Sequence, residues 1–239
     1  MNKKIIFNLK HNIVQFNEYI EVLKNYEHKV KSFLAVPTPF LSFFIPEDRK
    51  FLLAQSVDPV VWGAYTGAVG PNLLAHLGIP GAIIGHSEVR LRAYSQADIN
   101  IAIRLCIDHQ IQPIICIGEM NRRTAINEIK IQIEELLFLH EKGIPLTIAY
   151  EPRWAIGQAE PCDIDYLNEI ILIMKRFFDY SKIEFLYGGG LSLETIDEFI
   201  NHEELDGLLL GKVSLDLRAV SIILDKASEQ KEILQESII

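Results

Sequence analysis

Short apolar runs alternate with stretches of helical periodicity along the whole chain. Several runs are apolar at consecutive positions, as in Ile114–Ile117 and Leu208–Leu210. This pattern is typical of strands that are buried on both faces of a parallel sheet. The runs predict eight strands: Lys4–Leu9, Phe33–Pro37, Phe51–Gln55, Gly81–His86, Gln112–Ile117, Leu146–Glu151, Glu184–Tyr187 and Asp206–Leu210.

The segments between these runs carry apolar residues at helical spacing. They predict helices over Asn17–Tyr26, Gln96–His109, Thr124–Leu139, Asp163–Phe178 and Leu215–Ala227, and a further helix that begins at Ser192 as its N-cap. A short helix is expected near Phe40–Phe44. Ser56–Gly78 is interpreted as a loop with a short helix, and its apolar residues Val60 to Trp62 leave a strand there as an alternative.

The alternation of strands and helices predicts βαβ units and a parallel sheet. Eight such units in 239 residues match an α/β chain built as one (β/α)8 barrel, which typically takes about 250 residues. The alternative is a doubly wound open sheet, which usually has a glycine-rich loop after its first strand. Asn8 to Asn12 contain no glycine. Because no linker or change of composition interrupts the chain, we expect a single domain over residues 1–239.

The charge and the cysteines narrow the possible partners and location. The chain has 23 Lys and Arg against 32 Asp and Glu, a net charge of −9. This balance argues against nucleic acid or an anionic membrane as a partner but leaves room for a small anionic substrate. Three cysteines without a C-x-x-C spacing favour a reducing compartment. Since no run reaches the ~18 apolar residues of a membrane span, we expect a cytoplasmic protein.

Chemically useful residues stand at the carboxyl ends of the predicted strands. Asn8 and Lys10 end the first, His86 the fourth and Glu151 the sixth, while glycines end the seventh and the eighth. In a barrel these strand ends meet at one rim, where active sites lie. A Lys, a His and a Glu at three separate strand ends exceed what turns require, so the pattern predicts a catalytic site.

Six segments carry these residues, and together they resemble the triosephosphate isomerase family in order and spacing across the chain. They are Asn8–Lys10, Ile84–Glu88, Cys116–Glu119, Ala149–Gly157, Tyr187–Gly189 and Asp206–Gly211. The resemblance implies a TIM barrel that interconverts dihydroxyacetone phosphate and D-glyceraldehyde 3-phosphate through an enediolate. It implies no cofactor and no metal.

The resemblance also assigns roles to individual residues. It implies that Glu151 is the base, that His86 is a neutral electrophile at the substrate carbonyl, and that Lys10 supplies a positive charge. Asn8 would orient the substrate, and Glu88 would support the lysine. The phosphate would be bound by backbone N–H groups around Gly157, Gly189, Gly190, Gly211 and Lys212.

The chain departs from the family pattern in its phosphate loops and its lid. Gly190 stands where the family usually has serine, and Lys212 where it has glycine. The lid hinge is Gln158-Ala159-Glu160 instead of a Thr-Gly-Lys-like sequence. Two alternatives to the triose reaction follow: isomerisation of a related sugar phosphate, such as a tetrulose phosphate, and a barrel that has lost turnover and serves as a binding protein.

One further segment bears on assembly. Tyr65-Thr66-Gly67-Ala68 resembles the family loop that inserts into a partner subunit, so the resemblance implies a homodimer. Ala68 and Val89 occupy the positions of a family ion pair. Because both partners are replaced, no buried charge is left alone.

Overall fold

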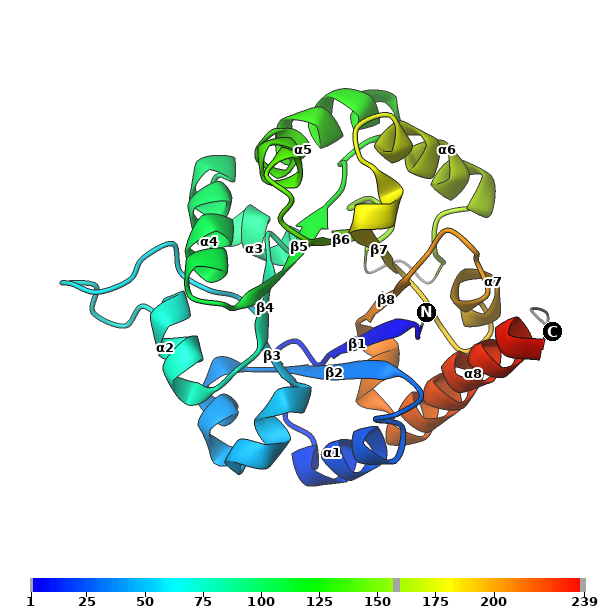
Figure 1. Cartoon of the computed structure of the whole chain (residues 1–239), viewed down its shortest axis with the longest axis horizontal. Coiled ribbons are helices and arrows are strands. Elements are labelled where there is room, and N and C mark those ends of the chain that lie inside the picture. Colours follow the sequence, from blue (N-terminus) through cyan, green and yellow to red (C-terminus); the bar gives the residue numbers. More distant parts are fainter. Residues whose placement is uncertain (1, 157–159, 237–239) are drawn as a thin grey trace.

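The computed structural model describes residues 2–156 and 160–236, with side chains up to residue 229. Within these residues, eight parallel strands close into a barrel in sequence order, with β1 paired to both β2 and β8 (Figure 1). The predicted (β/α)8 barrel is therefore confirmed. The strands are β1 (Lys4–Asn8), β2 (Lys31–Val36), β3 (Leu52–Ala54), β4 (Gly81–Ile84), β5 (Gln112–Ile117), β6 (Leu146–Tyr150), β7 (Ile183–Gly188) and β8 (Gly207–Leu210).

Helices form a ring around the strands in Figure 1. Local sequence sets where they begin: α4 starts with a capping box between Ser95 and Asp98, and the Asp163 carboxylate caps α6. After β2, two 3-10 helices, η1 (Thr38–Phe43) and η2 (Pro46–Phe51), take the place of a longer helix. The α-helices are α1 (Phe16–Asn25), α2 (Pro71–Leu77), α3 (Ser87–Arg92), α4 (Gln96–Asp108), α5 (Ala125–Glu141), α6 (Ile164–Lys175), α7 (Ile196–Ile200) and α8 (Leu217–Glu236).

The strands are buried on both faces, as their continuous apolar sequences predict. Side chains that point into the barrel form one cluster, which includes Ile6, Ile114 and Leu209. The alternate side chains pack against the apolar stripes of the helices in a larger cluster. Because successive strand residues face opposite sides, a run such as Ile114–Ile117 contributes to both clusters. The strands are thus fixed between two apolar layers, and their carboxyl ends are held at one rim.

Two sequence predictions about local structure are wrong. The helix expected from Ser192 begins at Ile196, because the Ser192 carbonyl accepts the N–H groups of Thr195 and Ile196 and closes a turn first. The last helix spans Leu217–Glu236, since Lys212–Leu215 forms a separate 3-10 helix, η5. Ser56–Gly78 is a loop with one short helix, α2, as predicted, and Val60 to Trp62 form no strand in the described structure, which excludes the alternative.

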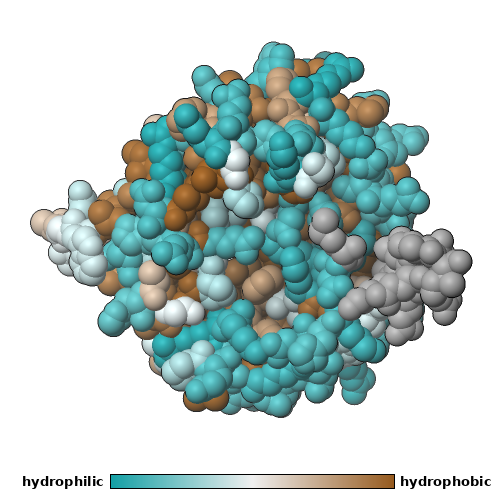
Figure 2. All heavy atoms as spheres, in the orientation of Figure 1, coloured by the Kyte–Doolittle hydropathy of each residue, from teal (hydrophilic) through white to brown (hydrophobic). Residues whose placement is uncertain are grey.

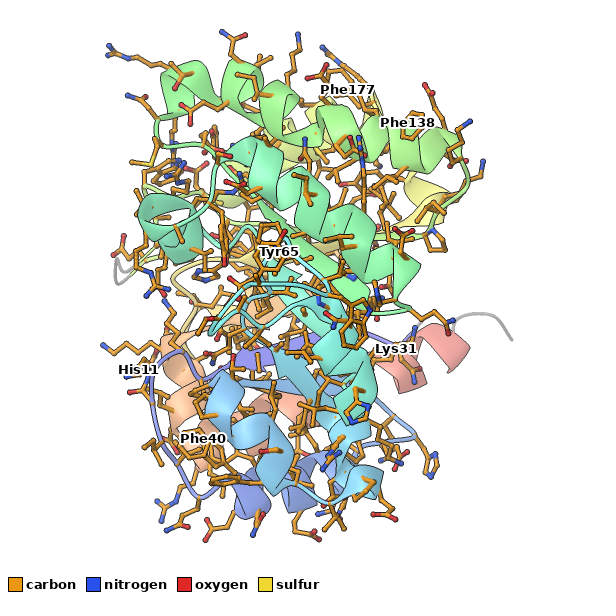
Figure 3. The ribbon with its side chains drawn as sticks, turned by 90° about the vertical axis from the view of Figure 1, so that its left-hand side faces the viewer. His11, Lys31, Phe40, Tyr65, Phe138 and Phe177 are labelled. Carbon is orange, nitrogen blue, oxygen red and sulfur yellow. The ribbon has the colours of Figure 1, made fainter. Side chains whose placement is uncertain are left out.

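The loop between β3 and α2 projects from the barrel wall at the left of Figure 1. In Figure 3 it faces the viewer, with Tyr65 near the centre of the view. Its base is closed by Asp58, whose backbone N–H donates to the Val69 carbonyl at 2.9 Å and whose carboxylate accepts the Val69 N–H. The Tyr94 hydroxyl donates to the same carboxylate. The projection is therefore a braced structural element.

None of the helices in the described part of the chain has both the length and the apolar character needed to cross a bilayer. The face seen in Figure 2 is mostly hydrophilic, with hydrophobic residues dispersed among polar ones.

Candidate active site

A cavity of about 620 Å³ opens at the carboxyl ends of the strands. It brings together the predicted residues Asn8, Lys10, His86, Glu151, Gly189, Gly190, Gly211 and Lys212. Glu88 does not line the cavity but bonds to Lys10, which does. Gly157, Gln158 and Ala159 lie outside the described residues, and the remaining hinge residue, Glu160, is exposed. Residues from five strand ends thus converge on one pocket.

His86 and Glu151 face each other within this cavity. His86 is the N-cap of α3, where its Nδ1 accepts the Glu88 backbone N–H at 3.3 Å. An accepting Nδ1 places the proton of a neutral imidazole on Nε2, and Nε2 lies 3.2 Å from Oε1 of Glu151. The other oxygen of Glu151 accepts the Ser87 N–H at 3.4 Å. The two side chains are buried and aligned for proton transfer chemistry.

Glycines on both sides make room for Glu151. A Cβ on Gly118 would lie 1.9 Å from the Glu151 carbonyl oxygen, and one on Gly188 would lie 3.0 Å from its Cγ. The backbone N–H of Glu151 is fixed by a 2.7 Å bond to the Ile117 carbonyl. Cys116 lies beneath the carboxylate, where burial, followed by the Glu151 charge, raises the pKa of its thiol. The Glu151 side chain is therefore confined to a narrow slot.

Lys10 reaches the cavity from a turn and not from the strand. β1 ends at Asn8, and Lys10 lies two residues beyond it with φ of +52°. Few non-glycine residues adopt this left-handed conformation. The Asn8 side chain accepts the Lys10 N–H at 3.0 Å, and the Gln55 amide donates to the Lys10 carbonyl at 2.8 Å. Gln55, which the sequence analysis missed, therefore helps to hold the turn that points Lys10 into the site.

Glu88 pairs with the Lys10 ammonium at 2.7 Å. Burial alone would raise the pKa of Glu88, but the hydrogen bond and the charge of Lys10 outweigh it and hold this pKa below its usual value. The predicted link between Glu88 and the lysine is therefore present. Since both side chains are partly exposed, we expect this pair to orient Lys10 more than to stabilise the fold.

The far end of the cavity is built from backbone. Gly189 and Gly190 follow β7, and Gly211 and Lys212 follow β8 at the start of η5. A Cβ on Gly189 would lie 2.3 Å from the Tyr187 hydroxyl, so this position has no space for a side chain. Lys212 is exposed and forms no ion pair within the described residues. Glycine backbone beside an unpaired ammonium suits an anion.

Glu119 forms a buried cluster beside the site. Its carboxylate is fully buried and accepts hydrogen bonds from the Tyr150 hydroxyl, the Trp154 indole and the Tyr166 hydroxyl. Burial, and then the Glu119 charge, raises the pKa of both tyrosines. The sequence showed Glu119 at a strand end without assigning it a role. The signal that could have found it is an acidic residue two positions after the end of a buried strand.

Arg122 covers this cluster from outside. Its guanidinium lies 4.2 Å from the Trp154 ring centroid and 4.4 Å from that of Tyr166. It also pairs at 2.7 Å with Asp163, the N-cap of α6. The segment that follows Glu151 is therefore anchored at Trp154, and the residue that begins α6 is tied to the same side chain.

Sequence comparison identifies the family to which this barrel belongs. The sequence profile of the triosephosphate isomerase family matches residues 1–227. The chain belongs to the triosephosphate isomerase family. Curated relatives named triosephosphate isomerase include the protein of Prochlorococcus marinus strain NATL2A, which is 36% identical and covers 82% of this chain and 84% of the relative. The relative from Wigglesworthia glossinidia brevipalpis is 32% identical and covers 89% of both chains. The relative from Gloeobacter violaceus is 35% identical over 72% of this chain and 73% of its own length.

The family match spans the whole catalytic architecture. Residues 1–227 include all the strands described above and every side chain and glycine that lines the cavity. Isomerisation of triose phosphate is therefore the activity of this chain.

Proposed function

We propose that the cavity at the carboxyl ends of the strands is the site at which this family member interconverts dihydroxyacetone phosphate and D-glyceraldehyde 3-phosphate. The observation that carries the proposal is the contact between Nε2 of His86 and the Glu151 carboxylate, 3.2 Å apart. A base beside a hydrogen-bond donor, with a cation in the same cavity, is what proton abstraction next to a carbonyl requires.

Glu151 is the base in this proposal. Its carboxylate removes a proton from the carbon next to the carbonyl, and the electron pair of that C–H bond moves onto the carbonyl oxygen to give an enediolate. The same carboxyl group then returns the proton to the neighbouring carbon. In the structure the carboxylate is bonded to His86 and to the Ser87 N–H. The substrate must therefore replace these contacts before the proton can be taken.

His86 and Lys10 stabilise the charge that develops on oxygen. The Nε2 proton of His86 bonds to the carbonyl oxygen, and we assign to this imidazole the transfer of the hydroxyl proton between the two substrate oxygens. The ammonium of Lys10 supplies a fixed positive charge, and Asn8 holds the backbone that positions it. Preorganised donors of this kind contribute most where charge forms only in the transition state.

The phosphate occupies the glycine-lined end of the cavity. The N–H groups around Gly189, Gly190 and Gly211 face an anion with little obstruction, and Lys212 adds a charge at the same end. The Lys212 ammonium offers a side-chain contact where glycine would offer backbone alone. The contribution of Gly157 stays a prediction.

A coupled assay of the purified protein on glyceraldehyde 3-phosphate tests the proposal. Glu151→Ala should lower kcat by at least about 100-fold, since general base catalysis contributes roughly 10²–10⁴-fold. The matched control is Glu134→Ala, which removes an exposed carboxylate on the outer surface of α5. Full activity in Glu151→Ala would refute the assignment of the base.

A tetrulose phosphate run alongside separates the remaining alternatives. Preference for the tetrulose would mean that Gly190 and Lys212 have changed the substrate. Phosphate-dependent binding of the triose without turnover would mean a binding protein. Both outcomes would contradict the proposed reaction.

We further propose that the chain forms a homodimer through the loop that carries Tyr65, Thr66 and Gly67. The large aromatic residues Trp62 and Tyr65 on this loop have 75% and 54% of their surface exposed to solvent. Braced exposed aromatic residues are typical of an interaction surface, and Tyr65 lies at the centre of this face in Figure 3. Sedimentation velocity of the wild type and of Tyr65→Ser tests the proposal, and a wild-type monomer would refute it.

A cytoplasmic location is also proposed. All three cysteines are buried free thiols, which suits a reducing compartment. Cell fractionation with a tagged chain checks this, and recovery outside the cytoplasm would contradict it.

A further inference from the structure

A second cavity lies at the opposite end of the barrel from the active site. Its volume is about 460 Å³, within the range of ~300–1,000 Å³ that is typical of pockets for small molecules. Gln112, Leu146 and Ile183, the first residues of β5, β6 and β7, line it. The cavity is therefore formed at the amino ends of these strands, whereas Glu151 and Gly189 follow the carboxyl ends of β6 and β7.

His140, near the end of α5, brings an unused hydrogen-bond donor to the wall of this cavity. Its Nε2 accepts the Asp179 backbone N–H at 3.1 Å, which places the proton of a neutral imidazole on Nδ1. This Nδ1 is buried and has no hydrogen-bond partner among the described residues. Because a buried donor without a partner is costly, a ligand that offers an acceptor to His140 is favoured.

Two further donors come from the short 3-10 helix η4 (Tyr180–Lys182), which directly follows Asp179. The Tyr180 hydroxyl is also buried without a partner in the described part of the chain, and its ring packs on that of Phe185 with the centroids 5.5 Å apart. The Lys182 ammonium pairs at 3.0 Å with Asp179 and is largely exposed. The donors of His140, Tyr180 and Lys182 are thus neighbours, and a carboxylate is the ligand group that accepts hydrogen bonds from all of them.

Asp206 gives another part of the wall a negative charge. Its carboxylate accepts the Phe185 backbone N–H at 2.8 Å and forms no ion pair within residues 2–156 and 160–236. Burial raises the pKa of this carboxyl; the Phe185 N–H and the charge of Lys3 oppose the shift, and the charge of Glu184 adds to it. Glu184 also lines the cavity but is paired with Lys4. An ammonium group of a ligand would therefore be stabilised beside Asp206.

We propose that this cavity is a second binding site, separate from the active site, and that it takes a zwitterionic α-amino acid. The carboxylate of the amino acid accepts hydrogen bonds from His140 and Tyr180, with the Lys182 ammonium close by. Its ammonium group lies against Asp206. An anion alone leaves Asp206 without a partner, and a cation alone leaves the donors of His140 and Tyr180 unused. Only a ligand with both groups satisfies both parts of the wall.

The test is a titration of 15N-labelled protein with L-alanine, followed through the backbone amide signals of Gly143 and Ser181 in the cavity wall. These signals should shift saturably, whereas the Gly189 amide in the active site should not shift. Acetate and methylammonium are the matched ligands, because each carries one of the two charged groups. Each should bind at least about 10-fold more weakly than L-alanine, since it loses one set of charge-assisted contacts.

Two variants test the two parts of the wall separately. Asp206→Asn removes the charge but keeps an oxygen that can accept the Phe185 N–H, so it should weaken L-alanine at least about 10-fold and leave acetate binding unchanged. His140→Gln removes the Nδ1 donor but keeps an acceptor for the Asp179 N–H, so it should weaken both L-alanine and acetate. Asp165→Asn, at an exposed position in the first turn of α6, is the matched control and should bind L-alanine as the wild type does.

The outcomes distinguish a site for a zwitterion from simpler sites. The absence of a saturable shift with L-alanine would overturn the proposal. Acetate or methylammonium that binds as tightly as L-alanine would also overturn it, because the site would then recognise an anion or a cation alone. Wild-type affinity for L-alanine in both Asp206→Asn and His140→Gln would show that the amino acid binds elsewhere. Because the titration needs no turnover, its result is independent of the proposed reaction.

Discussion

Replacement of Glu119 by glutamine tests how strongly the hydrogen bonds to the buried Glu119 carboxylate stabilise the protein. One of these bonds holds Trp154, in the segment that follows Glu151. The Glu119 carboxylate accepts hydrogen bonds of 3.0, 2.7 and 2.9 Å from Tyr150, Trp154 and Tyr166. Glutamine keeps the shape and one oxygen but removes the charge. A hydrogen bond to a charged group contributes about 1.5–3 kcal/mol and a neutral one about 0.5–1.5 kcal/mol. Each bond should therefore weaken by about 1 kcal/mol, and the three together by ~3 kcal/mol.

Urea unfolding at a fixed protein concentration measures this loss, since association contributes to the apparent stability. The control is Tyr150→Phe, which removes one donor and leaves two, and it should cost less than Glu119→Gln. In a thermal scan Glu119→Gln should lower Tm by roughly 6–12 °C, at 2–4 °C per kcal/mol for a chain of this size. A loss below about 1 kcal/mol would refute the reasoning, because the carboxylate charge would then not stabilise these bonds.

Three further predictions concern the base, the phosphate end and the interface. Gly188→Ala places a Cβ 3.0 Å from Cγ of Glu151, so kcat should fall by about 10–100-fold, and an unchanged kcat would show that the base works from another position. Lys212→Gly should raise KM more than it lowers kcat, and a large fall in kcat with constant KM would contradict a role at the phosphate alone. Ala68→Glu should weaken the dimer by burying an unpaired charge; an unchanged sedimentation coefficient would mean that this loop lies outside the interface.

The barrel could be predicted because the apolar pattern of each strand is visible in its local sequence. Gln112–Ile117 is found with the same bounds in sequence and structure, and Leu146–Tyr150 differs by one residue from the predicted run. Each contains a run of consecutive apolar residues, Ile114–Ile117 and Ile148–Tyr150, as burial between a barrel interior and a helical layer demands. Predictions at helix ends were weaker, because the Ser192 carbonyl closes a turn, whereas an N-cap serine accepts a hydrogen bond through its side-chain hydroxyl.

The residues of the site could be named from sequence, but their geometry could not. The apolar pattern ends before Lys10, and nothing in it indicates a positive φ there or the amide of Gln55 that helps to hold it. Gln96 also looks like an ordinary first residue of a helix. Its contact with Arg90 depends on how α3 and α4 pack at the ends of β4 and β5. Such contacts depend on tertiary structure, whereas the burial of a strand can be predicted from the pattern of apolar residues in its local sequence.

The end of β5 links the base to the segment that follows it. Cys116 lies beneath the Glu151 carboxylate, Gly118 packs on the Glu151 carbonyl, and Glu119 binds the indole of Trp154. The Ile117 carbonyl between them accepts the Glu151 N–H. Four consecutive residues therefore set the position of the base, the space around its backbone and the start of the segment that leads away from it. A backbone shift at the end of β5 would move the Glu151 side chain, its backbone and the following segment together. Substitutions there should therefore change kcat and stability jointly, whereas changes at Lys212 should act mainly on substrate binding.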